Sequence, residues 1–446
     1  FANLGVGATS ATYTITYSVT SPALTVSQSI AVTYGDASQL AIATQPVGGK
    51  TGDNLGTQPV IRVLDAYGNL VANSNAAVTA SMVSPRAGDV LTGTTVNAVN
   101  GVATFNALNI VTLPGVSSLN FASGSLTAVT SANFTIVHAD ASQLVITTQV
   151  VGGNATGDQL ATQPVVEIRD RFNNLATAST ANVTVSVASG AAGSLTSGQT
   201  TVAAVAGVAT FNNVRLVGTP GTAYTLQFAS GSLATATSSS FTVTNNTAYQ
   251  LAITTQPVAG QTALALTTQP IVEVQDFYGN RVVGDNTTVV TAAISSGAGG
   301  ALAGAKVITA VNGVVTFTDL ALTGTPSVNY RLAFASSPLV AANSNNITVV
   351  AGAPTQISMV TQPVGAITGK NLGTQPVVQL LDFYGNLVLS DSSTVVSVTV
   401  ASGTGATLSG NLTATAVNGV ATFSGVKLSA TPVSYTHLRA HETGRN

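Results

Sequence analysis

The chain has 446 residues, of which only 6% are charged, and its formal net charge at pH 7 is −2. No cluster of lysines and arginines occurs, so the composition argues against nucleic acid and anionic membranes as partners. Cysteine is absent, which excludes disulfides and thiolate sites. No apolar run approaches the ~18 residues that a membrane-spanning helix requires.

The first residues carry the pattern of strands that recur later in the chain. Ala11–Leu40 align without gaps to Thr222–Leu251, and this places Tyr13 on Tyr224 and Tyr17 on Phe228. We therefore expect residues 1–37 to be the last strands of a repeat whose beginning is missing. No secretion signal follows Phe1. Because we expect the chain to start in the middle of a protein, the absence of a signal is no evidence for a cytoplasmic location.

One stretch then occurs four times and sets the period of the chain. Its copies are TQPVIRVLDAYGN, TQPVVEIRDRFNN, TQPIVEVQDFYGN and TQPVVQLLDFYGN, at 57–69, 162–174, 268–280 and 374–386. The prolines of these copies are spaced by 105, 106 and 106 residues. That period fits one small domain and is too long for a solenoid repeat. We predict domains at 38–140, 141–247, 248–353 and 354–432, joined end to end by short polar linkers, the fourth lacking its last strands.

Within each repeat, apolar and polar residues alternate with a period of two. Val272 and Val274 alternate with Glu273 and Gln275, for example, which predicts a strand with one buried face. Further strands are predicted at 208–211, 290–294, 314–317, 330–334 and 347–350. No segment has the period or composition of a helix. About seven strands per repeat, separated by Gly, Pro, Asn and Ser turns, predict tandem antiparallel β-sandwiches of the immunoglobulin type.

Each copy of the stretch ends in a turn. Gly68, Gly279 and Gly385 share one position in it, where the second repeat has Asn173. Both residue types accept a left-handed backbone, so we predict a positive φ there. The aspartate that opens each turn is predicted to accept backbone hydrogen bonds. The alternative is that this aspartate binds a calcium ion. Calcium prefers six to eight oxygens, and each repeat has few acidic residues. The aspartates concerned are Asp65, Asp170, Asp276 and Asp382.

Residues for catalysis are scarce. Outside the C-terminal tail the only histidine is His138, in a linker, and the only glutamates are Glu167 and Glu273, on polar strand faces. These residues do not form a Ser/His/Asp arrangement or a carboxylate pair for glycoside hydrolysis. We therefore predict no catalytic, cofactor or metal site. Most tyrosines and phenylalanines are expected to face inward, and exposed aromatics recurring on each repeat would favour a binding function.

The last residues, 433–446, differ in composition from the rest. They read VSYTHLRAHETGRN and contain two of the three histidines. The stretch resembles a translated sequencing adapter, and we interpret it as non-native.

The Asn-Gly pairs that precede strands, for example Asn100–Gly101, predict hairpin turns.

Taken together, the TQPVV, NGVATF, LxGTP and closing xFTV motifs resemble bacterial immunoglobulin-like tandem repeats. Such repeats occur in invasin- and intimin-like adhesins and in large repetitive surface proteins. The resemblance covers 1–432 and implies a non-catalytic extracellular stalk of a surface protein, with other domains of the same chain as partners. Two alternatives remain: repeats that bind a glycan or a cell-surface protein themselves, and accessory domains of an extracellular enzyme.

Overall fold

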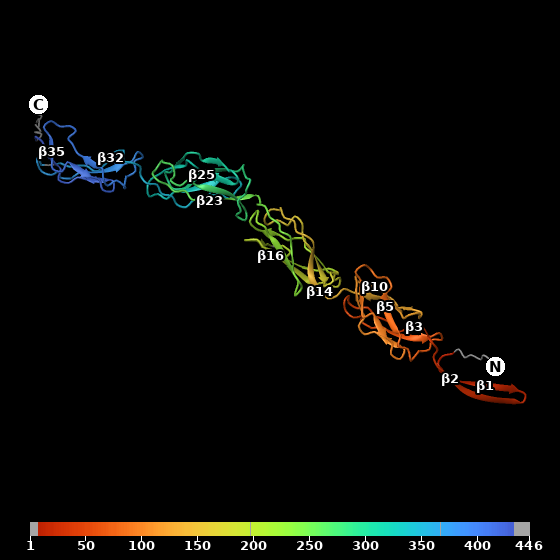
Figure 1. Cartoon of the computed structure of the whole chain (residues 1–446). Helices are drawn as coiled ribbons and strands as arrows, with labels where there is room; N and C mark the ends of the chain where they lie inside the picture. Colours follow the sequence, from red (N-terminus) through yellow and green to blue (C-terminus); the bar gives the residue numbers. More distant parts are fainter. Residues whose placement is uncertain (1–7, 197, 366, 432–446) are drawn as a thin grey trace, which may run out of the picture. The chain divides into compact units, whose positions relative to one another are not determined.

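The computed structural model describes residues 8–196, 198–365 and 367–431, and the predicted adapter-derived tail lies outside them. The described residues form strands, turns and loops, with no helix among them (Figure 1). In this part of the chain there is accordingly no helix long and apolar enough to cross a membrane. The chain divides into two compact units between Thr244 and Asn245. The all-β prediction is confirmed.

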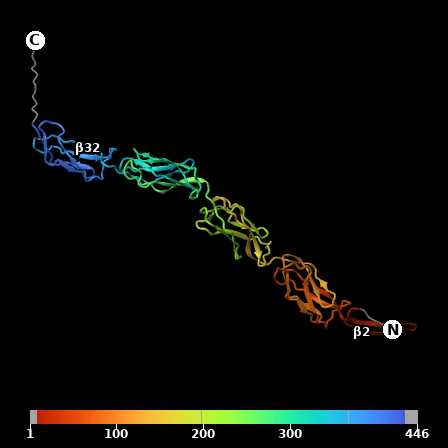
Figure 2. The same ribbon diagram turned by 45° about the horizontal axis from the view of Figure 1, so that its top comes forward.

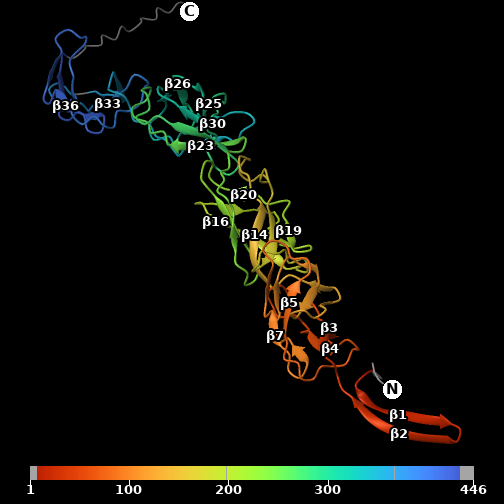
Figure 3. The same cartoon turned by 45° about the vertical axis from the view of Figure 1, so that its right-hand side comes forward.

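The first unit opens with a hairpin and continues with two sandwiches. The hairpin consists of β1 (Ala11–Thr20) and β2 (Ala23–Val32), which pair antiparallel over their whole length (Figure 3). The first sandwich comprises β3 (Ala37–Thr44), β4 (Val60–Asp65), β5 (Ala77–Met82), β6 (Val90–Thr92), β7 (Thr95–Asn97), β8 (Val102–Thr104), β9 (Asn109–Val111), β10 (Gly115–Ser117), β11 (Leu119–Ala122), β12 (Val129–Thr130) and β13 (Phe134–Ile136). The second comprises β14 (Ala141–Thr148), β15 (Val165–Asp170), β16 (Asn182–Ser189), β17 (Ser194–Leu195), β18 (Thr201–Ala203), β19 (Val208–Thr210), β20 (Leu216–Val217), β21 (Thr225–Ala229) and β22 (Ala236–Thr237).

The second unit holds the third and fourth sandwiches, coloured green to cyan and blue in Figure 2. The third sandwich comprises β23 (Ala248–Thr255), β24 (Ile271–Asp276), β25 (Val289–Ser296), β26 (Ala301–Ala303), β27 (Val307–Thr309), β28 (Val314–Thr316), β29 (Ala321–Thr323), β30 (Arg331–Ala335) and β31 (Ala342–Asn343). The fourth comprises β32 (Gln356–Thr361), β33 (Val377–Leu381), β34 (Val395–Ser397), β35 (Thr407–Ser409), β36 (Thr413–Thr415), β37 (Val420–Thr422) and β38 (Lys427–Ser429).

Each complete sandwich has the same two main sheets. In the first, they are β3-β4-β8 and β12-β11-β5-β7, seven strands in all, and short ribbons such as β6-β9 add to them. This order, with Greek-key connections between two antiparallel sheets, is immunoglobulin-like, although the strand β7 pairs with β5 and not with β8. A parallel contact closes the edge, because the Leu40 N–H donates to the Thr127 carbonyl at 3.0 Å. The predicted tandem sandwiches of about seven strands are confirmed.

The core of each sandwich lies between its two sheets. The strand β4 alternates between buried and more exposed residues, as its period of two predicts. Where the sheets face each other, one phenylalanine from each sheet forms a pair with ring centroids 5.3 to 5.5 Å apart, a favourable separation for aromatic packing. The pairs are Phe105–Phe121, Phe211–Phe228 and Phe317–Phe334.

Two local predictions have different outcomes. The Asn-Gly hairpins are confirmed, since Asn100 and Gly101 both have positive φ, 52° and 75°. The prediction of a continuous strand at 347–350 is wrong. That segment makes only isolated bridges, Tyr330 with Ile347 and Gln261 with Val350. Its two ends bond to different partners, so no ladder of consecutive pairs forms.

Candidate functional site: the aspartate turn and the repeat joint

The turn after β4 is built around one carboxylate, and the other sandwiches repeat it. Asp65 Oδ1 accepts hydrogen bonds from the backbone N–H groups of Tyr67 and Asn69, both at 2.9 Å. Gly68 in this turn has φ 86°, and its counterpart Asn173 has φ 68°. The predicted positive φ is therefore confirmed, including at the position where asparagine replaces glycine.

The second oxygen of the same carboxylate binds the chain segment that enters the sandwich. The Gly35 N–H donates to Asp65 Oδ2 at 2.8 Å, and the Ala139 N–H donates to Asp170 Oδ2 at 2.8 Å. In the second unit the corresponding bonds, both 3.0 Å, join Asn246 to Asp276 and Gly352 to Asp382. Each aspartate thus fastens both its own turn and the preceding linker. The sequence predicted the first of these roles and missed the second.

We call this carboxylate, which holds both the turn and the linker, the aspartate clamp. In the first sandwich it is charged although it is buried. Asp65 is 1% exposed. Burial by itself would raise the pKa of the Asp65 carboxyl, but hydrogen bonds from Gly35, Asn69 and Tyr67 outweigh it and lower the pKa to about 2. The pKa values of Asp170 and Asp382 are lowered in the same way, with burial opposing and the turn and linker hydrogen bonds prevailing. These three carboxylates are therefore ionised at neutral pH.

The same geometry bears on the calcium alternative. Asp65 Oδ2 accepts a bond from the Asn69 side chain at 2.8 Å besides the linker bond, so each carboxylate oxygen has two donors from the protein itself. Among the residues that the structure describes, no group of three or more His, Asp or Glu could hold a metal ion. The turn aspartates act as acceptors for backbone and amide N–H groups.

Aromatic residues at this turn face outward. Strand phenylalanines such as Phe228 and Phe334 are buried as predicted, whereas Tyr67 is 64% exposed and Phe383 is 72% exposed. Phe277 and Tyr278 form an edge-to-face pair with centroids 5.3 Å apart, and Tyr249 lies 5.1 Å from Phe277. The expectation that most aromatics face inward therefore fails at the turns, because the turn projects its side chains away from the core between the sheets.

In the first unit, turn residues of the second sandwich contact the first sandwich. A Cβ added to Gly52, whose φ is +79°, would lie 2.2 Å from Phe172 Cζ, so this approach requires glycine. Arg171 Nη2 lies 3.1 Å from Asp53 Oδ1, and the Arg171 guanidinium lies over the Phe172 ring at 4.7 Å from its centroid. The turn thus forms part of a joint between successive domains.

The residues considered for catalysis have separate local partners. His138 Nδ1 lies 2.8 Å from the Ala139 carbonyl oxygen, within the clamped linker. The Glu167 carboxylate pairs with Arg169 at 2.6 Å. The Glu273 carboxylate accepts a bond from the Gln275 amide at 3.1 Å. These contacts give the three residues positioning roles on strands and at the joint.

No protein-family model and no curated protein matches the chain. Among solved structures, the chain is similar to invasin, a bacterial integrin-binding protein, with 15% identity and a TM-score of 0.27, over 88% of this chain and 74% of that one. It is similar to the protocadherin γB4 extracellular domain, with 13% identity and a TM-score of 0.32, over 93% and 65%. It is also similar to domains 1–6 of the surface layer protein SbsC, with 14% identity and a TM-score of 0.21, over 95% and 54%.

Proposed function

We propose that this chain is a non-catalytic stalk or spacer segment of a bacterial secreted or cell-surface adhesin-like protein. The observation that carries the proposal is the aspartate clamp. Each of the four sandwiches binds the backbone of its incoming linker through a buried carboxylate. A spacer needs domains that fold on their own cores and joints that resist bending. The clamp supplies the second requirement, because it fixes the last residues of the linker to the body of the domain.

The surface composition supports an extracellular location. Serine, threonine and asparagine take the place of charged side chains, which make up only 6% of the chain. Such a surface lacks the strong field that would attract nucleic acid or anionic membrane. The partners that this function requires are the neighbouring domains of the same polypeptide, and the working end would lie in another domain.

Single-molecule stretching of the full chain tests the spacer function. We expect the three complete sandwiches to unfold as separate events, each releasing roughly 350 Å of chain for a period of about 106 residues. Asp170→Asn, which weakens a clamp, should lower the unfolding force of one event. Asp158→Asn is the matched control, because Asp158 is exposed in a loop of the same sandwich. Unfolding of several sandwiches in one step, or equal effects of the two variants, would contradict the proposal.

A second candidate function rests on the exposed aromatic turns. Tyr249, Phe277 and Tyr278 form a continuous edge-to-face group on the surface of the third sandwich. Exposed rings of this kind stack on sugars, so the repeats would bind a glycan themselves.

The second candidate is tested by sedimentation with insoluble chitin and cellulose. If the aromatic group binds sugars, the wild-type chain cosediments, and Phe277→Ala reduces the bound fraction at least tenfold. Phe105→Ala is not a suitable control, because Phe105 is in a core, so Val311→Ala, an exposed apolar residue of the same sandwich, serves instead. Absence of cosedimentation removes this candidate for those two glycans and leaves the spacer proposal unaffected.

A further inference from the structure

A buried tyrosine fills one end of the core in the second and third sandwiches. In the second, Tyr224 is fully buried, and its Oη accepts a hydrogen bond from the Thr219 N–H at 2.7 Å. In the third, the Thr325 N–H donates to Tyr330 Oη at 2.8 Å. The surrounding loop leaves room for the ring, since a Cβ added to Gly193 would lie 2.6 Å from Tyr224 Cε1. This end of both cores is therefore occupied by an aromatic ring.

The first sandwich has a serine at the position of this tyrosine. Tyr224 pairs with Phe241 in an antiparallel bridge. Phe134 of β13 is the counterpart of Phe241, and it pairs with Ser117 of β10. The pairing thus assigns Ser117 to the place of Tyr224. Because serine has no ring, this side chain does not fill the end of the core.

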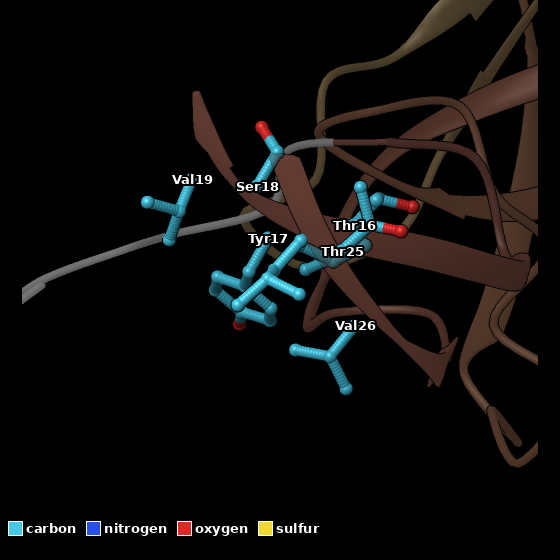
Figure 4. Close-up of a pocket in the computed structure, with 8 residues that line it drawn as sticks. Thr16, Tyr17, Ser18, Val19, Thr25 and Val26 are labelled. Carbon is cyan, nitrogen blue, oxygen red and sulfur yellow. The ribbon is translucent and has the colours of Figure 1, made fainter. Parts of the chain in front are cut away.

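A cavity lies beside Ser117. Its volume is about 150 Å³, and a cavity of about that size holds one benzene ring. The hollow on the hairpin β1–β2, which Figure 4 shows with Thr16 and Val26 on it, has no charged residue in its lining. The lining of the cavity in the first sandwich instead contains Arg86 and Asp89. Hydroxyl and amide side chains add to its polar lining, namely Ser84, Thr112, Ser117, Ser118 and Asn133.

The two charged residues come from a loop that differs from its counterparts. Residues 83–89 read VSPRAGD, whereas the second and third sandwiches have ASGAAG at 188–193 and SSGAGG at 295–300. Two hydrogen bonds fix the loop, one from the Arg86 N–H to Asp89 Oδ2 at 2.7 Å and one from the Asp89 N–H to the Arg86 carbonyl at 3.1 Å. The loop therefore holds Arg86 at the cavity through its backbone and does not use the guanidinium.

The Arg86 guanidinium is free to bind a ligand. Its Nη2 lies 3.6 Å from the site that a Cβ on Gly115 would take, which places the group beside β10. In the part of the chain that the structure describes, the cations of ion pairs are Lys50, Arg169 and Arg171, so this guanidinium has no carboxylate partner there. A guanidinium is planar and binds a carboxylate through two parallel hydrogen bonds.

We propose that the cavity of the first sandwich binds a hexuronate, a sugar ring that carries a carboxylate. The carboxylate pairs with the Arg86 guanidinium, and the sugar hydroxyls bond to the polar lining and to the Asp89 carboxylate. Leu113 and Val116, which also line the cavity, contact the apolar C–H face of the sugar. A neutral sugar would leave the guanidinium unpaired, and a phosphate ion would leave the apolar wall bare.

This site is separate from the functions proposed above. It belongs to the first sandwich alone, because the second and third fill the corresponding space with Tyr224 and Tyr330. It uses neither the aspartate clamp nor the aromatic group on the third sandwich. Loss of hexuronate binding would therefore leave the spacer proposal untouched.

Isothermal titration calorimetry of the full chain with D-galacturonate tests the ligand class. We expect saturable binding to one site. D-Galactose, which lacks the carboxylate, and inorganic phosphate, which lacks the ring, should each bind at least about tenfold more weakly. No binding of galacturonate, or equal binding of galactose or phosphate, overturns the proposal.

Variants of Arg86 test its role as the carboxylate partner. Arg86→Ala should weaken galacturonate binding about tenfold or more, because a charge-assisted hydrogen bond is lost. Arg86→Lys should restore only part of the affinity, since an ammonium group lacks the planar fork. Arg62→Ala, an exposed arginine on β4 of the same sandwich, is the control and should bind as the wild type does. Equal affinities of Arg86→Ala and the wild type would rule out this partner.

Filling the cavity tests where the ligand sits. Ser117→Tyr returns the ring that the second and third sandwiches have, and it should abolish binding without lowering the Tm measured by circular dichroism. Thr104→Tyr, at an exposed position of β8, is the control and should still bind. If Ser117→Tyr does not fold, Thr112→Val decides, because it keeps the side-chain shape and removes one hydroxyl, which should weaken binding about threefold or more. Full affinity in either variant contradicts the site.

A hexuronate occurs as a free sugar and as a unit of acidic polysaccharides, and trigalacturonate distinguishes these sources. If the occupant is the end of a polysaccharide, trigalacturonate should bind more tightly than galacturonate and lose that affinity in Arg86→Ala. If the occupant is the free sugar, the two further units should weaken binding, because the cavity has room for one ring. Tight binding of trigalacturonate that persists in Arg86→Ala would place the sugar elsewhere and overturn the proposal.

Discussion

The third and fourth sandwiches carry the same repeat and differ in whether their cores are closed. Leu251 on β23 is 5% exposed, and Ile357, its counterpart on β32, is 65% exposed. In the third sandwich the Leu251 N–H donates to the Val340 carbonyl at 2.9 Å, and the Phe317 ring faces Phe334. The described part of the fourth sandwich has the first sheet, its turn clamp and the β34–β36 pair of the second sheet, with a smaller buried core between them. The first strands of a repeat thus build the first sheet, the clamp and part of the second sheet, and in the third sandwich β30 and β31 complete the burial of the core.

The largest expected difference concerns the facing phenylalanines. Phe317→Ala should destabilise the third sandwich by about 3–5 kcal/mol, because it removes a buried ring from a closed core. Phe423→Ala should cost the fourth sandwich less, because Phe423 is buried there in a smaller core and no aromatic ring of the described residues packs against it. Hydrogen exchange with mass spectrometry, resolved to β28 and β37, measures both in the full chain. Equal costs would show that the facing ring of Phe334 adds little to the stability of the third sandwich.

A smaller difference is expected at the first strand. Leu251→Ala should cost roughly 2–5 kcal/mol, as for other buried leucines. Ile357→Ala should change stability by no more than about 0.5 kcal/mol, because exposed substitutions rarely do more. The amide exchange rates of β23 and β32 report the two effects. A large cost at Ile357 would show that this side chain is covered.

Loss of the aspartate clamp is expected to destabilise the third and fourth sandwiches by similar amounts. Asp276→Asn and Asp382→Asn each replace an acceptor oxygen by a donor and leave buried N–H groups unpaired. We expect each to cost about 1–3 kcal/mol and to raise amide exchange at Asn246 and Gly352, the clamped linker residues. If only the third sandwich responded, the clamp would depend on the closed core.

The smallest effect is that of acid. Because the folded pKa of Asp65 is about 2, below the ~3.9 of an unfolded aspartate, the unfolded chain binds the proton first as pH falls. The clamp's contribution is therefore fully present above about pH 4 and is lost towards pH 2. Thermal unfolding followed by circular dichroism should show Tm falling across this window. The Asp65→Asn variant should lose less Tm there, and an identical fall in both proteins would contradict the assignment.

The joint in the first unit shows how one residue changes a repeated feature. Phe172 approaches the first sandwich only because position 52 is glycine. The counterpart of Gly52 in the third sandwich is Ala263, which has the same left-handed backbone, φ 65°, but carries a methyl group. In the second unit Tyr384, the counterpart of Phe172, is 52% exposed. A joint that needs glycine at this position, like that between the first and second sandwiches, therefore cannot form at every repeat.

The sequence by itself determined the repeat, the strands and the chemistry of the turn. These properties are local: a period of two selects a strand with one buried face, and glycine or Asn173 selects a left-handed turn. Only the tertiary structure decided which groups meet across long separations. It placed Gly35 on Asp65 and Ala139 on Asp170, each some 30 residues apart, and it turned the aromatics of the turns outward. Such pairings depend on the order of strands in a sheet, and the pattern within a single strand does not specify that order.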